Sequence, residues 1–161
     1  MTDAQAQAAL VVGPGEGPTV HGPAGGPLTF KVRGEQTGGT LLVIENEIAP
    51  GDGPPEHTHA NEAEWWHVVE GDLRFKLGEE MSVAPAGSFV YVPQGVPHAF
   101  QNVGGVPARI LVSFSPAGME RFFDAFAALP DGPVDRDSFA RLGREAGMDV
   151  VGPPLAVSHP L

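Results

Sequence analysis

The chain has 161 residues, of which 42% are hydrophobic and 18% charged, a balance typical of one globular domain and too apolar for a disordered chain. The net charge of −11 argues against binding to nucleic acid or to an anionic membrane surface, and no apolar run approaches the roughly 20 residues of a membrane span. Cysteine is absent, which excludes disulfides, thiolate metal sites and thiol nucleophiles.

The N-terminal segment differs in composition from the rest of the chain. Residues 1–27 contain no lysine or arginine and are dense in glycine and proline, so we expect a lead-in segment with one edge strand near residues 10–12. The sequence MTDAQAQAALVVG has an acid at Asp3 and a five-residue apolar stretch, unlike a secretory signal. A cytoplasmic location is the resulting expectation.

Strand-like segments follow, separated by turns of glycine, proline and aspartate. They cover residues 28–32, 40–48, 62–70, 73–77, 81–84, 88–92, 98–103 and 108–114. Many short strands at this spacing are typical of an all-β sandwich or barrel, and the 22 glycines and 17 prolines disfavour a helix bundle. We therefore expect one barrel over residues 28–115, without a linker that would divide the domain.

The pattern becomes helical after the last strand. Ser115 is expected to cap a first helix, with Pro116 at its first position. Apolar residues then recur at helical spacing, namely Met119, Phe122, Phe123, Phe126 and Leu129. We expect these side chains to pack over a sheet or across a dimer contact, rather than to bind a ligand.

A second short helix is expected to start at Asp135 and to end at Gly147, where a left-handed cap would fit. Its buried residues would be Phe139, Leu142 and Ala146. Residues 116–161 should therefore form one or two short C-terminal helices and a tail that pack on the same domain.

Three of the six histidines and one glutamate form a pattern typical of metal binding. His57 and His59 are two residues apart, so on an extended strand both imidazoles point to the same face. Glu64 follows after a short connection, and His98 begins a later strand. Brought together in a barrel, three neutral nitrogens and one carboxylate suit a divalent transition metal (Fe, Ni, Co, Mn, Cu or Zn) with open positions for substrate or oxygen.

The spacing of these residues is more informative than their identity. From Gly51 the chain reads G-x5-H-x-H-x4-E-x6-G, and from Gly87 it reads G-x5-P-x-G-x2-H-x3-N. These are the two motifs of the cupin superfamily, in order and with every defining position filled. The chain therefore resembles a metal-binding cupin, whose fold is a jelly-roll barrel or double-stranded β-helix. The resemblance implies that one metal ion binds to His57, His59, Glu64 and His98.

Longer segments resemble bacterial monocupins of the quercetinase-like group, over roughly residues 10–130. They are FKVRGEQTGGTLLVIE, PPEHTHANEAEWWHVVEGDLRF, FVYVPQGVPHAFQNVG and SFSPAGMERFF. In that group the metal binds a flavonol or similar enol, dioxygen cleaves its ring, and the matching glutamate takes the proton of the substrate hydroxyl. The resemblance implies a dioxygenase acting on an enolic or phenolic small molecule, with Glu64 as the catalytic residue. Because the chain departs from the group at Trp65, Trp66 and His67, we expect a substrate other than bulky quercetin.

Strand alternation predicts the lining of the substrate pocket. Counting from Glu64, Trp66 shares its inward face, whereas Trp65 and His67 face the other way. The residues expected around the metal are Trp66, Phe75, Tyr91, Phe100 and Phe114. Such a cavity suits an aromatic or otherwise apolar substrate, although each of these side chains could instead fill the barrel.

Other functions remain open. A non-redox metal cupin (an isomerase, cyclase, lyase or decarboxylase) would use the same four ligands, with the metal as a Lewis acid only. A non-catalytic small-molecule-binding cupin is disfavoured, because regulatory cupins usually carry a DNA-binding helix-turn-helix and the C-terminal tail is not basic. A metal-free epimerase is disfavoured because all four metal positions are filled. Cupins commonly pair through barrel strands, so we also expect a homodimer in which a partner or the N-terminal segment covers Trp65.

Overall fold

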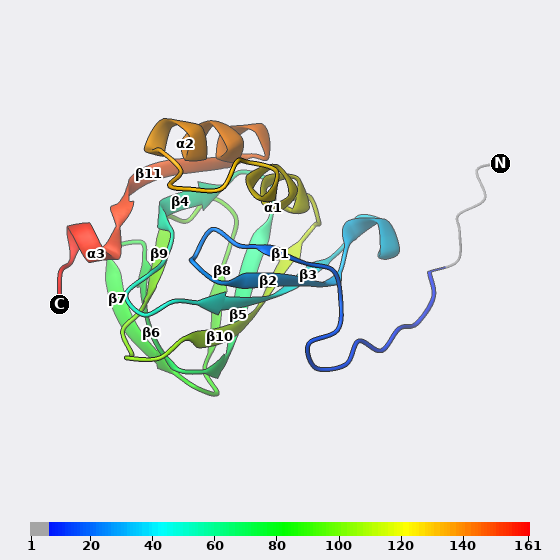
Figure 1. Ribbon diagram of the computed structural model, residues 1–161, viewed down its shortest axis with the longest axis horizontal. Helices are drawn as coiled ribbons and strands as arrows, with labels where there is room; N and C mark the ends of the chain where they lie inside the picture. The colour runs from blue at the N-terminus through cyan, green and yellow to red at the C-terminus, as the bar shows by residue number, and fades with distance from the viewer. Residues whose placement is uncertain (1–6) are drawn as a thin grey trace.

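The computed structural model describes residues 7–161, and its main feature is a pair of antiparallel β-sheets that face each other (Figure 1). The six-stranded sheet has the order β1 (Thr19–His21), β2 (Pro27–Val32), β3 (Leu42–Ile48), β10 (Ala108–Ser115), β5 (Ala63–Glu70) and β8 (Phe89–Val92). The five-stranded sheet has the order β11 (Met148–Pro154), β4 (Pro55–His59), β9 (His98–Asn102), β6 (Asp72–Leu77) and β7 (Glu80–Pro85). The predicted all-β class is confirmed.

The core lies between the two sheets, because alternate residues of each strand point inward. The inward side chains of β3 are Leu42, Ile44, Asn46 and Ile48, all of them buried. Those of β10, which lies between β3 and β5, are Ile110, Val112 and Phe114. Because the pleat alone decides which positions face inward, a polar residue at one of these positions also points into the interior.

Gly71 shows why one of the motif glycines is needed. It lies between β5 and β6, where the chain passes from one sheet to the other. Its φ of 92° is a conformation that side chains rarely adopt, and a Cβ there would lie 2.7 Å from Cβ of Ala108. Glycine therefore permits both the turn and the close approach of β10.

The first and last strands of the barrel, β1 and β11, differ from the prediction. Residues 10–12 form no strand, and the edge strand is β1, which pairs with β2 across a hairpin closed by the Gly22 N–H and the Gly26 carbonyl, 2.9 Å apart. β11 was not predicted, because its two prolines and one glycine suggest a tail. Prolines are tolerated there because β11 is an edge strand, paired on one side only with β4.

The first helix begins later than predicted. Ser115 does not cap it, because Ser115 is the last residue of β10 and its hydroxyl donates to the Thr40 carbonyl over 2.8 Å. Pairing with β3 and β5 keeps this stretch extended, and α1 runs from Glu120 to Ala127.

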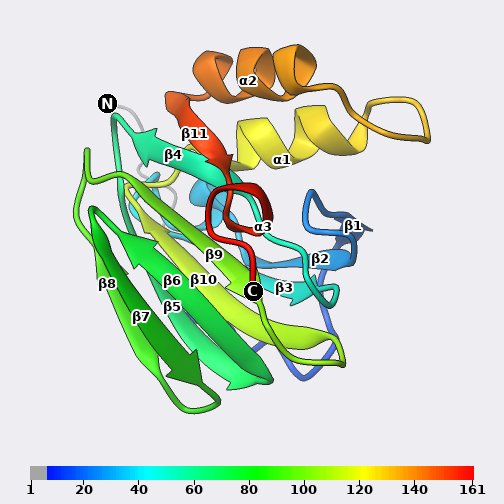
Figure 2. The same ribbon diagram turned by 90° about the vertical axis from the view of Figure 1, so that its left-hand side faces the viewer.

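The second helix is confirmed where it was predicted. α2 (Arg136–Glu145) is capped by Asp135, whose carboxylate accepts from the Ser138 N–H over 2.9 Å. Gly147, with φ 83°, follows the helix, and α3 (Leu155–Ser158) adds a single turn near the C-terminus. α1 and α2 lie together over one end of the barrel, beside β4 and β11 (Figure 2). No helix within residues 7–161 is both long and apolar enough to cross a membrane.

Candidate metal centre

The structure brings the four predicted ligands together inside the barrel. His57 and His59 come from β4, His98 from β9 and Glu64 from β5, so both sheets contribute. One nitrogen or carboxylate oxygen from each of the four lies within 4.8 Å of the others, and all four side chains are buried. His57 and His98 are direct partners in the pairing of β4 with β9, which sets their ring centroids 4.3 Å apart.

The backbone fixes the orientation of two imidazoles. Nδ1 of His57 lies 2.7 Å from the Pro55 carbonyl, and Nδ1 of His98 lies 2.9 Å from the Val96 carbonyl. A carbonyl can only accept, so Nδ1 carries a proton in both rings; Nε2 of neutral His57 is left with its lone pair, whereas Nε2 of His98 faces the Glu64 carboxylate at 2.9 Å. This is the tautomer that a metal bound through Nε2 requires.

Glu64 lies between the other two imidazoles. Its Oε2 is 2.8 Å from Nε2 of His59 and 2.9 Å from Nε2 of His98. Burial raises the pKa of this carboxyl, but the attraction of His59 and the contacts with both rings outweigh it and hold the pKa far below its usual range. Glu64 is therefore an ionised carboxylate in the protein interior, which makes it available as a metal ligand.

The histidines differ in their affinity for protons. Burial lowers the pKa of His57, and the neighbouring His98 and His59 lower it further. Burial also opposes the charged form of His59, but the attraction of Glu64 and the contacts with Glu62 and Glu64 raise its pKa to about 9. In the metal-free protein, His59 is therefore protonated, and its positive charge balances the negative charge of Glu64. A bound metal cation would take over this role.

Sequence reasoning missed the role of Glu62. Oε1 of Glu62 lies 2.9 Å from Nδ1 of His59, and both side chains are almost fully buried. This contact is one of the causes that raise the pKa of His59. A signal was present in the sequence, because an acid three residues after His59 can fold back over the turn between β4 and β5.

The donor set fits a divalent transition metal. Three imidazoles and one carboxylate converge from the strands, backbone carbonyls occupy Nδ1 of two of the rings, and Glu64 is ionised. Nitrogen and carboxylate ligands of this kind suit Fe, Ni, Co, Mn, Cu or Zn. The cluster can therefore hold one metal ion.

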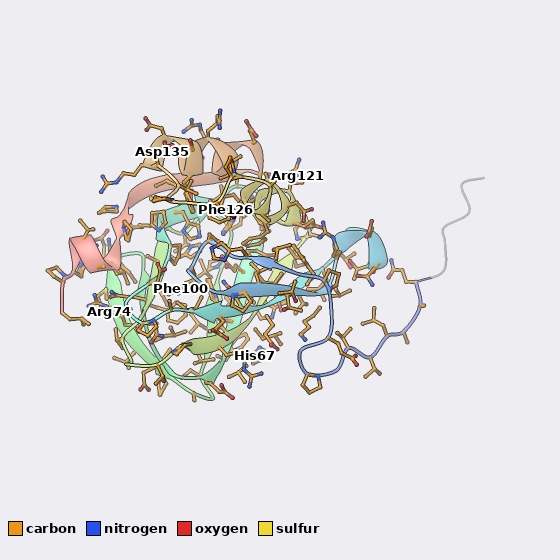
Figure 3. All side chains as sticks on the ribbon, in the orientation of Figure 1. His67, Arg74, Phe100, Arg121, Phe126 and Asp135 are labelled. Carbon is orange, nitrogen blue, oxygen red and sulfur yellow. The ribbon has the colours of Figure 1, made fainter. Side chains whose placement is uncertain are left out.

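A cavity opens from this cluster, and three of the five predicted pocket residues line it. Trp66, Phe100 and Phe114 face the cavity together with His57, His59 and Glu64. Phe75 does not line it, because this side chain is fully buried behind Trp66 and Phe100, with ring centroids 5.2 and 5.6 Å away. Figure 3 shows Phe100 in the interior of the barrel and His67 at its outer surface.

The prediction for Tyr91 is wrong. Tyr91 pairs with Trp65, whereas Val92 pairs with Glu64, so the pleat turns Tyr91 outward with Trp65 and leaves Val92 inside. Its side chain is 54% exposed and does not line the cavity. The pairing register of β5 with β8 decides this, and composition alone does not reveal it.

The helices contribute more to the cavity than predicted. Phe122 and Phe123 of α1 and Phe139 of α2 pack over the barrel, as expected, but they also line the cavity. Met119 and Met148 line it as well. The cavity volume is about 60 Å³, room for about four to six water molecules at 10–15 Å³ each.

Comparison with known proteins agrees with this architecture. Residues 44–114 match the Cupin domain family. The tetracenomycin polyketide synthase protein TcmJ of Streptomyces glaucescens is 31% identical over 70 residues, which cover 44% of this chain and 47% of TcmJ. Polyketide synthase CurC of Streptomyces cyaneus is 36% identical over 69 residues, 43% of this chain and 45% of CurC. The chain thus spans less than half the length of these curated relatives.

A similar solved structure is that of a predicted oxalate decarboxylase from Thermotoga maritima. The TM-score is 0.60 at 19% identity, over 66% of this chain and 99% of that one. At this identity the likeness concerns the fold alone. The protein has the cupin fold, and the domain match supports a place in the cupin superfamily.

Proposed function

We propose that the protein is a metal-dependent cupin enzyme and that it acts, like the quercetinase-like group, as a dioxygenase on an enolic or phenolic small molecule. The observation that carries this proposal is the buried cluster of His57, His59, Glu64 and His98 at the end of an aromatic-lined cavity. The proposed ligands are these four residues, and Glu64 is also the proposed catalytic base.

Two features support an enolic or phenolic substrate. The cavity wall outside the cluster is almost entirely apolar, with Trp66, Phe100, Phe114 and the helix phenylalanines, which suits an aromatic body. The relatives TcmJ and CurC are named for polyketide synthases, and polyketides carry 1,3-dicarbonyl groups that enolise and cyclise to phenols.

The residues of the site suit removal of a proton from such a substrate. A bound divalent metal would supply the Lewis acidity that lowers the pKa of an enol or phenol hydroxyl. Glu64 is ionised and faces the cavity, so it can accept that proton. The apolar walls exclude water and leave the resulting anion electron-rich. In a dioxygenase reaction the substrate then supplies the electrons, and both atoms of dioxygen enter the products.

The size of the cavity adds a condition. The cavity volume of about 60 Å³ is smaller than the ~150 Å³ of an engineered apolar cavity that binds benzene. An aromatic substrate therefore needs more room than this volume, and Phe122 and Phe123 of α1 and Phe139 of α2 are among the side chains that would have to adjust to it. This supports a substrate smaller than quercetin.

A non-redox metal cupin is the second candidate. Proton removal by Glu64 at a Lewis-acidic metal needs no oxygen and is the first step of many isomerase, cyclase, lyase or decarboxylase reactions. The names of TcmJ and CurC favour this candidate, since polyketide assembly depends on ring closures between enolised carbonyls.

Oxygen uptake separates the two candidates. The metal-loaded protein is mixed with a panel of phenols, 1,3-diketones and flavonols, and dioxygen and substrate are followed together. The dioxygenase proposal predicts stoichiometric loss of both, abolished in Glu64→Gln. Substrate conversion at an equal rate without oxygen would contradict it and support the non-redox candidate.

We also propose a homodimer that forms through the outer face of the six-stranded sheet. On this face Trp65 pairs with Tyr91, and His67 pairs with Phe89. The side chains of Tyr91 and Phe89 are more than half exposed. Such an aromatic patch is costly to leave in water. Sedimentation at micromolar concentration should show a dimer that Tyr91→Glu and Phe89→Glu together dissociate; a wild-type monomer would contradict the proposal.

A further inference from the structure

Asn46 is a polar exception on an apolar face. It occupies an inward position of β3, where the neighbouring inward residues are Leu42, Ile44 and Ile48. The side chain is only 5% exposed, and its Oδ1 atom has no hydrogen-bond partner within residues 7–161. A buried amide without a partner destabilises the fold, and leucine would fill the position without that cost.

The amide of Asn46 lines the same cavity as the metal cluster. Ile44, Val112 and Phe114 lie on the wall with it, so it is a lone hydrogen-bonding group in an apolar stretch. Gly22 lies next to the Asn46 amide. A side chain at position 22 would crowd it, because a Cβ there would lie 3.2 Å from Oδ1 of Asn46. An amide offers both an acceptor and donors, so a hydroxyl or a carbonyl group can bind to it.

Asn46 lies far from Glu64 along the sheet. On the shared neighbour β10, Asn46 pairs with Ile110 and Glu64 pairs with Phe114, four residues further along. This corresponds to roughly 13 Å along the strand at ~3.3 Å per residue. A ligand that contacts both residues must therefore be elongated, with polar groups at its two ends.

A second unpartnered group lies between these two positions. Trp66 pairs with Val112, halfway between Ile110 and Phe114, and its buried Nε1–H has no partner among the described residues. Buried tryptophan N–H groups usually find an acceptor. Two polar groups without hydrogen-bond partners in one cavity indicate a ligand that supplies those partners.

We propose that Asn46 is a specificity-determining residue that binds a hydroxyl or carbonyl group on the end of the substrate remote from the metal cluster. The inference rests on the proposed function and narrows the substrate class to elongated aromatic molecules with a second polar group. Such a ligand has its reacting enol or phenol oxygen at Glu64 and its apolar rings along Val112 and Trp66.

The test uses two probes that differ in one hydroxyl group, 2-naphthol and 2,6-dihydroxynaphthalene. Their affinities are measured by calorimetry on the metal-free and the Ni²⁺-loaded protein. The wild type should bind the diol about tenfold more tightly, the effect of one good hydrogen bond. Asn46→Leu should bring the ratio to about one and leave the melting temperature equal to or above that of the wild type. The matched control Ile48→Leu, on the same face of β3 but outside the cavity lining, should keep the tenfold ratio.

Several results would overturn the inference. A ratio of one in the wild type, no binding of either naphthol, or an unchanged ratio in Asn46→Leu would each contradict it. A lower melting temperature of Asn46→Leu with an unchanged ratio would assign the residue a structural role. Metal content and oxygen uptake are measured on the same samples. If the wild type binds no metal or takes up no oxygen but still prefers the diol tenfold, only the proposed function is contradicted. If the wild type binds metal and takes up oxygen but binds the two naphthols equally, only the role of Asn46 is contradicted.

Discussion

Nδ1 of His59 lies 2.9 Å from a carboxylate oxygen of Glu62, whereas the other two histidines of the cluster have backbone carbonyls at Nδ1. One imidazole is therefore oriented by an acidic side chain that is itself only 2% exposed. A carboxylate at Nδ1 holds Nε2 toward the cluster and increases the basicity of the ring. Glu62 thus acts on the metal site through His59.

Replacing Glu62 should weaken metal binding without removing a ligand. We expect Glu62→Ala to lower the affinity for Co²⁺ or Ni²⁺ about 10–100-fold, and Glu62→Gln, which keeps a side-chain oxygen, to lower it less. Competition with a chromogenic chelator measures this, and the Co²⁺ absorption spectrum should shift. Glu70→Ala is the control, because Glu70 is exposed and pairs with Arg109. Equal affinities of wild type and Glu62→Ala would contradict the positioning role.

Glu64→Gln should cost more activity than metal. Glutamine keeps the size and one oxygen donor of Glu64 but removes the base, so turnover should fall about 10²–10⁴-fold. Metal content, measured by atomic emission on the same preparation, should fall much less. If turnover survives within about tenfold, the proton acceptor is another group.

The stability of the metal-free protein should depend on pH through His59 and Glu64. The pKa of His59 is raised from 6.5 to about 9, because attraction to Glu64 and Glu62 outweighs its burial. Its contribution to stability is therefore complete below pH 6.5 and disappears as the pH rises through 9. The pKa of Glu64 is lowered from 4.5, so its contribution is complete above pH 4.5 and disappears in more acidic solution.

Both contributions are complete between pH 4.5 and 6.5. Above that window the free energy of unfolding should decrease by up to about 3 kcal/mol by pH 9. Urea unfolding at several pH values measures it, and the difference from His59→Gln isolates the histidine. A His59-dependent stability that increased from pH 6.5 to 9 would have the wrong sign.

Trp66 should control which substrates enter. It is fully buried, lines the cavity and packs against Phe75, His98 and Phe100. Trp66→Ala should therefore lower the stability by about 3–5 kcal/mol and also broaden the set of accepted ligands, with the metal still bound.

Phe75→Ala is the matched control for this change, because Phe75 is equally buried but does not line the cavity. It should cost similar stability and leave the ligand profile unchanged. Trp66→Phe provides a milder variant if the alanine protein does not fold. A profile that stays the same in both Trp66 variants, despite lower melting temperatures, would show that Trp66 only fills the barrel.

Local patterns were sufficient to predict most of the barrel strands and the four clustered residues, but not β1, β4 and β11. Alternation and turn residues locate the strands, and the spacing of His57, His59, Glu64 and His98 identifies the cluster. The failures have a common cause, which is that pairing between distant segments overrides local signals. Tyr91 faces outward because of its register against Trp65, and Ser115 stays extended because β10 is held on both sides.

The roles of Glu62 and Asn46 also depend on tertiary structure. Glu62 matters because the turn after β4 folds back on His59, and Asn46 because the inward face of β3 meets the cavity. The alternation Leu42, Ile44, Asn46, Ile48 does indicate an inward amide in the sequence. Its lack of a partner and its place on the cavity wall follow only from the packing of both sheets.

Metal stoichiometry in His59→Ala and His98→Ala tests the central claim most directly. These residues lie on two neighbouring strands of the same sheet, β4 and β9, and belong to the cluster of four. Each purified variant is saturated with metal, dialysed and analysed alongside the wild type, with circular dichroism to check the fold. The account predicts about one metal ion per chain in the wild type and a sharp loss in both folded variants. An unchanged stoichiometry in both variants would contradict the assignment of the cluster as a metal site.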